Sequence, residues 1–150
     1  MGHTFSNHLY HIVFSTKERR RYIQGEAKAR LLDYICGVAT KKGGVVIRVD
    51  GTEDHLHLLA RIKPNISVAK FVGDIKANTS RWLSQTFPDF RSFRWQGGYS
   101  SFTVSKSNWE GVADYIDRQE EHHRKMTFEE ELKKLLRRHE LEFDPEDYLD

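Results

Sequence analysis

The segment of residues 55–62, HLHLLARI, constrains the fold of this chain most, because it reads as a buried strand with histidines at alternate positions. Side chains of a strand alternate between its two faces, so His55 and His57 share one face and Leu56 occupies the other. Leu56 is expected to anchor the strand in a core, while the imidazoles offer nitrogen atoms to one cation. Two histidines on a solvent-facing strand would give the same pattern, so the pair alone does not define a metal site.

The rest of the chain predicts one mixed α/β domain around this strand. Apolar periodicity, caps and turn residues predict strands at 5–15, 45–49, 55–62 and 93–104, and helices at 25–42, 67–86, 108–125 and 128–139. Gly97-Gly98 interrupts the last of these strands, so a hairpin or a bulge is expected there. Gly43-Gly44 ends the first helix, and Thr127 with Glu130 forms a capping box before the last. The order predicts an α+β class, ferredoxin-like (split βαβ) antiparallel sheet with two helices on one face. A further helix and a short C-terminal helical tail follow.

Charge is distributed unevenly along the 150 residues. Residues 126–150 carry a net charge of −5 and the preceding residues +7. We therefore expect a basic body, 1–125, and an acidic helical extension of the same domain, 126–150. A basic body is compatible with a nucleic-acid partner. The single cysteine, Cys36, excludes an internal disulfide framework and is expected in the core. Without a signal-like or membrane-spanning run, the expected location is the cytoplasm, with no membrane partner.

The helix expected at 108–125 carries the second set of candidate residues. Tyr115 and Gln119 are four residues apart and therefore lie on one flank of its apolar stripe. A tyrosine in this position usually packs against the core, and a glutamine is usually solvated. The alternative is that Tyr115 is a nucleophile beside a cation held by His55, His57 and Gln119, with Glu53 or Asp54 orienting an imidazole. Histidine and oxygen ligands suit Mg²⁺ or Mn²⁺, with zinc also possible, and a divalent cation would polarise a phosphate for attack.

The sequence at this point resembles a known family, the single-tyrosine HUH transposases of the insertion-sequence 200/605 type. The resemblance covers about residues 5–125 and rests on segments that occur in the same order. These are YHIVFSTKERR, DHLHLL, IKANTSRWL, WQGGYSSFTVS and YIDRQ. It implies that residues 1–125 form the catalytic domain and that Tyr115 cleaves single-stranded DNA, leaving a 5′-phosphotyrosine and a free 3′-hydroxyl.

The resemblance also implies ligands and partners. His55, His57 and Gln119 would hold Mg²⁺ or Mn²⁺, and the substrate would be hairpin-forming element ends. Members are typically homodimers in which the two subunits share active sites. A related branch acts on repetitive extragenic palindromes, and the sequence does not separate the two. Because the candidate helix carries one tyrosine, a single-nucleophile mechanism is favoured.

DNA-contact candidates are basic residues, each of which also fits an ordinary surface position. They are Lys76 and Arg81, which lie in a segment that resembles the family, and Arg19, Arg20 and Arg94. His8, His11, His122 and His123 are expected as strand or surface residues, with His122 as a reserve ligand.

Three further alternatives follow from the same residues. The first is a ferredoxin-like nucleic-acid-binding protein without catalytic activity. The second is a metallohydrolase that activates water, and the third is an inactive descendant of a transposase. The acidic extension is expected as dimer packing, as a structural cover or as a solvated helix.

Overall fold

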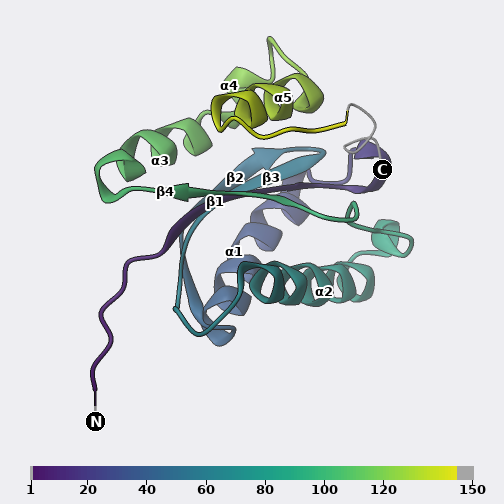
Figure 1. Ribbon diagram of the computed structural model, residues 1–150. Coiled ribbons are helices and arrows are strands. Elements are labelled where there is room, and N and C mark those ends of the chain that lie inside the picture. Colours follow the sequence, from purple (N-terminus) through teal and green to yellow (C-terminus); the bar gives the residue numbers. More distant parts are fainter. Residues whose placement is uncertain (1, 145–150) are drawn as a thin grey trace.

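The computed structural model describes residues 2–144 and forms a four-stranded antiparallel sheet with helices on both faces (Figure 1). The strands are β1 (Leu9–Ser15), β2 (Gly44–Thr52), β3 (His55–Ile62) and β4 (Ser100–Val104). The helices are α1 (Gly25–Lys41), α2 (Val68–Thr86), α3 (Trp109–Asp117), α4 (Gln119–His122) and α5 (Phe128–Arg138). Residues 145–150 of the expected acidic extension lie outside the described residues.

The sheet order is β2-β3-β1-β4, with β3 and β1 at its centre. All three pairings are antiparallel, and β1 pairs with both β3 and β4. Together with the element order β-α-β-β-α-β, this confirms the α+β class and the split βαβ arrangement expected from the sequence. The central position of β3 buries both of its faces.

The two faces of the sheet carry different layers. Figure 1 shows α1 and α2 on one side and α3, α4 and α5 on the other. The larger core lies under α1 and α2 and includes Leu56, Leu58, Ala60 and Ile62 of β3. On the opposite face, Leu59 packs against α3, while Val13 and Phe102 pack against α5. The period-two alternation of β3 therefore separates Leu56 from the histidines, as expected.

The β2–β3 hairpin sets the position of His55. Its two-residue turn, Glu53-Asp54, follows Thr52 of β2 directly. A Cβ atom at Gly51 would overlap the carbonyl oxygen of His55, so only glycine fits this approach of the two strands. Gly43 has φ +92° and ends α1, which confirms the predicted stop.

Four sequence expectations differ from the structure. The first strand begins at Leu9. Of the segment 93–104 only Ser100–Val104 is a strand, and Trp95 forms an isolated β-bridge with Thr16. The helix expected at 108–125 is broken at Arg118, whose φ and ψ are −103° and 22°. Cys36 is exposed, because it lies beside the buried stripe of α1.

No helix in residues 2–144 is long and apolar enough to cross a membrane.

Leu56 anchors β3 from the face opposite the histidines, so its truncation tests the fold. The residue is fully buried in the core under α1 and α2. We expect Leu56→Ala to lower the free energy of unfolding by about 2–5 kcal/mol, since it leaves a cavity in this layer. Urea unfolding measures the change. Val45→Ala, at a half-exposed position of β2, is the control and should cost less than about 1 kcal/mol.

Candidate active site

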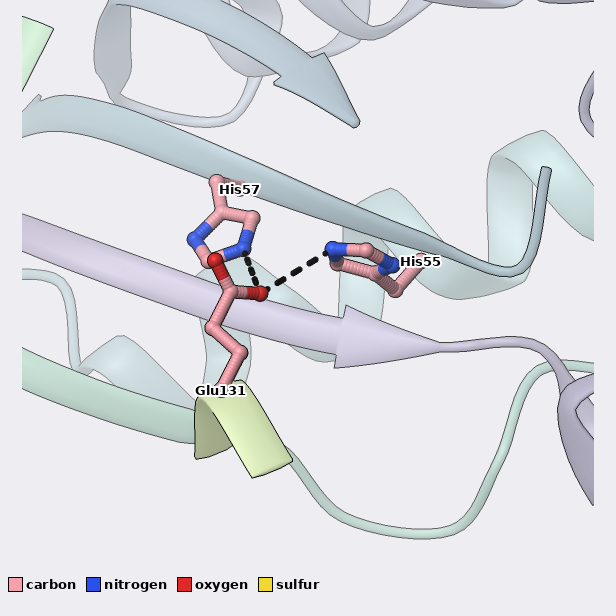
Figure 2. A group of neighbouring side chains, drawn as sticks. All are labelled: His55, His57 and Glu131. Atoms are coloured by element: carbon pink, nitrogen blue, oxygen red, sulfur yellow. Dashed lines mark hydrogen bonds and ion pairs between the residues drawn. The ribbon is translucent and has the colours of Figure 1, made fainter. Parts of the chain in front are cut away.

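His55 and His57 lie on the sheet face covered by α4 and α5, and both are fully buried. Figure 2 shows the two imidazoles from alternate positions of β3 directed at the carboxylate of Glu131. His55 Nε2 lies 3.2 Å and His57 Nε2 lies 2.9 Å from Glu131 Oε1. The alternation of the strand therefore brings both Nε2 atoms to one oxygen.

The second nitrogen of each imidazole is held by a different partner. His55 Nδ1 donates to Asp54 Oδ1 at 2.8 Å, so Asp54 is the carboxylate that orients an imidazole. His57 Nδ1 lies 2.7 Å from His11 Nε2 of β1. Contacts of this kind fix the ring orientation and leave Nε2 directed into the site. His11 is thus a buried part of the site, where the sequence suggested a strand or surface residue.

The charge states of these histidines differ. Burial would lower the pKa of His55, but hydrogen bonds to Asp54 and Glu131 raise it to about 9. Burial lowers the pKa of His57 to about 4 and that of His11 to about 3, so both rings are neutral near pH 7. Neutral imidazoles are the form that ligates metal ions, so His57 is already in that form, whereas His55 must release a proton when it binds one.

Glu131 of α5 is the site residue that sequence reasoning missed. Its side chain is 1% exposed, and its Oε1 also accepts a hydrogen bond from His123 Nε2 at 2.9 Å. Burial alone would raise the pKa of this carboxyl, but hydrogen bonds from His123, His55 and His57 hold it well below its usual range. Of the three roles expected for the acidic extension, a solvated helix is therefore wrong for α5, and so is the expected surface position of His123.

Tyr115 and Gln119 meet the same carboxylate from α3 and α4. The Tyr115 hydroxyl donates to Glu131 Oε2, and Gln119 Nε2 donates to that oxygen at 3.0 Å. Gln119 Oε1 also lies 2.9 Å from His55 Nε2. The structure thus brings together all four residues expected at the site, although α3 ends between Tyr115 and Gln119. His122 stacks on the ring of Tyr115, with centroids 4.6 Å apart.

The environment of Tyr115 holds its phenol in the neutral form. Burial, followed by the negative charge of Glu131, raises the pKa of Tyr115 far above its usual value. A phenol in this state needs a change in its surroundings before it attacks an electrophile.

The donor set around Glu131 fits a divalent cation. One ligand atom from each of His55, His57 and Glu131 lies within 4.8 Å of the other two. Two imidazoles and a carboxylate suit borderline or hard divalent ions, and the ring partners Asp54 and His11 complete the surroundings such ligands usually have. The three residues therefore form a group that can hold a metal ion. Glu131 joins the histidines in this group, and Gln119, the third ligand suggested by the sequence, lies beside it.

The DNA-contact candidates on α2 lie on the other side of the sheet from Tyr115. Lys76 Nζ donates to the carbonyl oxygens of Gln96, at 2.7 Å, and Gly98, and burial lowers its pKa to about 8. Arg81 is exposed and donates to Asn78. Lys76 therefore braces the loop before β4 in addition to any contact with DNA.

Of the remaining candidates, Arg19 ends a short 3-10 helix, Lys17–Arg19, while Arg20 and Arg94 lie in loops. Arg19 forms an ion pair with Glu129 of α5, which places it beside the active site. Arg20 pairs with Glu18, and Arg94 is exposed.

Comparison with known proteins agrees with this arrangement. The family described as "Transposase IS200 like" matches residues 4–119. The transposase for insertion sequence element IS200 of Salmonella typhimurium is 33% identical over 124 residues, covering 79% of this chain and 81% of the relative. The ISDra2 transposase TnpA of Deinococcus radiodurans is 28% identical over 115 residues, covering 73% and 82%.

Two solved structures share the fold. A Deinococcus radiodurans R1 protein assigned as a transposase has a TM-score of 0.63 at 25% identity and covers 79% of this chain and 96% of its own. A REP-associated tyrosine transposase bound to a REP hairpin has a TM-score of 0.62 at 12% identity, covering 82% and 72%. With the family model spanning most of the chain and a relative at 33% identity, this chain belongs to the IS200-like transposase family.

Proposed function

We propose that this transposase cleaves and rejoins single-stranded DNA through Tyr115, with a divalent cation and a covalent 5′-phosphotyrosine. One observation carries the proposal: the carboxylate of Glu131 contacts the Tyr115 hydroxyl through one oxygen and both histidines through the other. A nucleophile and a group of metal-ligating atoms therefore meet at a single buried side chain. A protein that only binds DNA would have no use for this convergence.

The proposed ligands are His55, His57 and Glu131, with the amide oxygen of Gln119 beside them. Mg²⁺ or Mn²⁺ suits this mixture of nitrogen and oxygen atoms. When bound, the cation would supply positive charge that polarises a phosphate and stabilises the charge that develops on it. Asp54 and His11 would keep the imidazoles oriented throughout.

The proposed chemistry balances without any redox partner. The Tyr115 oxygen attacks phosphorus, a new Tyr115–phosphorus bond forms, and the bond from phosphorus to the 3′ oxygen breaks. The phenol loses its proton, while the departing 3′ oxygen gains one. The phosphotyrosine conserves the energy of the broken bond, so a 3′-hydroxyl of another strand end can reverse the step and rejoin DNA.

The proposed partner is single-stranded DNA that folds into hairpins. The hairpin in the REP-associated neighbour, whose fold this chain shares, supports the choice of probe. Because Tyr115 contacts Glu131 of its own chain, we propose that a single chain carries a complete site and cleaves in cis. Cleavage in cis would differ from the shared active sites that the family resemblance implies, while a homodimer and a cytoplasmic location stay predictions.

The test uses 3′-labelled single-stranded DNA from the flanks of the gene, incubated with the protein and Mn²⁺ or Mg²⁺. The fragment on the 3′ side of the cut would stay attached to Tyr115, so a slow-migrating labelled band is expected on a denaturing gel. EDTA should abolish this band, and added Mn²⁺ should restore it. Free cleaved DNA without the band would instead indicate that water is the nucleophile.

A further inference from the structure

A cavity of about 450 Å³ opens beside Tyr115, between β4, α3 and α5. Tyr115 lines one wall, Phe102 of β4 the second, and Arg138 and His139 at the end of α5 the third. The volume lies within the range of roughly 300–1,000 Å³ that is usual for small-ligand sites. The cavity is therefore large enough to hold part of a substrate next to the phosphate that Tyr115 would attack.

Arg138 gives this cavity a positive charge. Its side chain is exposed and forms no hydrogen bond or ion pair with any other residue in 2–144. Its charge also acts on the Tyr115 phenol, which shows that the two groups are electrostatic neighbours. A guanidinium presents its N–H groups in a planar fork that matches the oxygens of a phosphate.

The wall beside Arg138 offers a flat aromatic surface. The ring of His139 stacks on Phe102, with centroids 4.2 Å apart and an angle of 16° between the planes. Asn108 lines the same cavity and carries an amide that both donates and accepts hydrogen bonds. Stacking on rings of this kind is how proteins hold the bases of single strands.

We propose that this cavity holds one nucleotide of the DNA strand adjacent to the phosphate that Tyr115 attacks. Arg138 binds the nucleotide's phosphate, and its base lies against the wall formed by His139 and Phe102. The inference rests on the proposed function, since it takes Tyr115 as the nucleophile. Arg138 and His139 lie beyond residues 4–119, so the match to the family does not account for them.

The first test measures binding without any cleavage. The ¹⁵N-labelled protein is titrated with each of the four deoxynucleoside 5′-monophosphates, and the amide signals of Gly111 and Thr103, which line the cavity, are followed by NMR. We expect saturable shifts, with Arg138→Ala weakening the affinity about tenfold through loss of a charge-assisted contact. Arg138→Lys should restore part of it, and Arg137→Ala, an exposed neighbour outside the cavity, should bind like the native protein.

Three results would overturn the inference. One is the absence of saturable shifts at Gly111 and Thr103. Another is equal binding of inorganic phosphate at matched ionic strength, which would mean that no base is held. The third is an equal loss in Arg137→Ala, which would indicate a diffuse charge effect. Unchanged signals from residues under α1 and α2, such as Leu56, would show that each variant is folded.

The cleavage assay separates this inference from the proposed function. If both hold, Arg138→Ala raises the KM for 3′-labelled DNA about tenfold and still forms the covalent band. If the nucleotide site fails, the native protein forms the band and Arg138→Ala matches it. If the proposed function fails, no band forms with the native protein, while the nucleotide titration is unaffected.

Discussion

Tyr115→Phe is expected to abolish the covalent protein–DNA band while leaving DNA binding intact. The substitution removes only the hydroxyl, which donates to Glu131, and keeps the half-buried ring that stacks on His122. Without an oxygen at this position no phosphotyrosine can form, so the loss should exceed about 10³-fold. The band on a denaturing gel measures the reaction, and fluorescence anisotropy with labelled hairpin DNA measures binding.

Tyr99→Phe is the matched control, because Tyr99 is a 40%-exposed tyrosine in the loop before β4. It should form the covalent band at the native rate. A band of normal intensity with Tyr115→Phe would show that another residue is the nucleophile, and the cis arrangement proposed above would then be wrong. Loss of DNA binding in Tyr115→Phe would instead mean that the phenol holds the substrate.

The fold and four site residues were accessible from sequence because local periodicity sets them. Alternation along β3 puts His55 and His57 on one face of the sheet and Leu56 on the other. The β2–β3 hairpin is likewise determined locally, by Gly51 and the turn residues that follow it. The break at Arg118 was not accessible, since the segment contains no proline and glycine only in its first turn. The break depends on the contact between Gln119 and His55, and a tertiary contact of this kind cannot be predicted from local sequence.

Glu131 was missed because its neighbours in the sequence suggest a solvated helix. It is the last of three consecutive glutamates in a segment of net negative charge. A signal was nevertheless present: the capping box at Thr127 fixes the start of α5, and Glu131 then falls on the stripe formed by Phe128, Leu132 and Leu135. A carboxylate within an apolar stripe must have buried partners. Only the fold identifies those partners as the histidines of β3.

Glu131→Gln is expected to lower the affinity for Mn²⁺ by more than about 100-fold, and the covalent band with it. The substitution keeps the size of the side chain but replaces the charged oxygen that both histidines contact by a neutral amide. Loss of a residue that only orients a ligand typically costs 10–100-fold in metal affinity, so loss of a ligand should cost more. Isothermal titration calorimetry with Mn²⁺ measures the affinity, and the gel assay measures cleavage.

The same variant decides whether α5 assists the reaction or blocks it. The Glu131 carboxylate also holds the Tyr115 hydroxyl and raises the pKa of the phenol, so a helix that merely covered the site would keep the nucleophile inactive. In that case Glu131→Gln would cleave faster than the native protein, and the carboxylate would not be a ligand. Glu130→Gln, an exposed position on the same helix, makes the equivalent charge change without contacting the site and should leave both affinity and rate unchanged. A simultaneous fall in Mn²⁺ affinity and cleavage in Glu131→Gln alone is therefore the result that identifies α5 as part of the catalytic machinery.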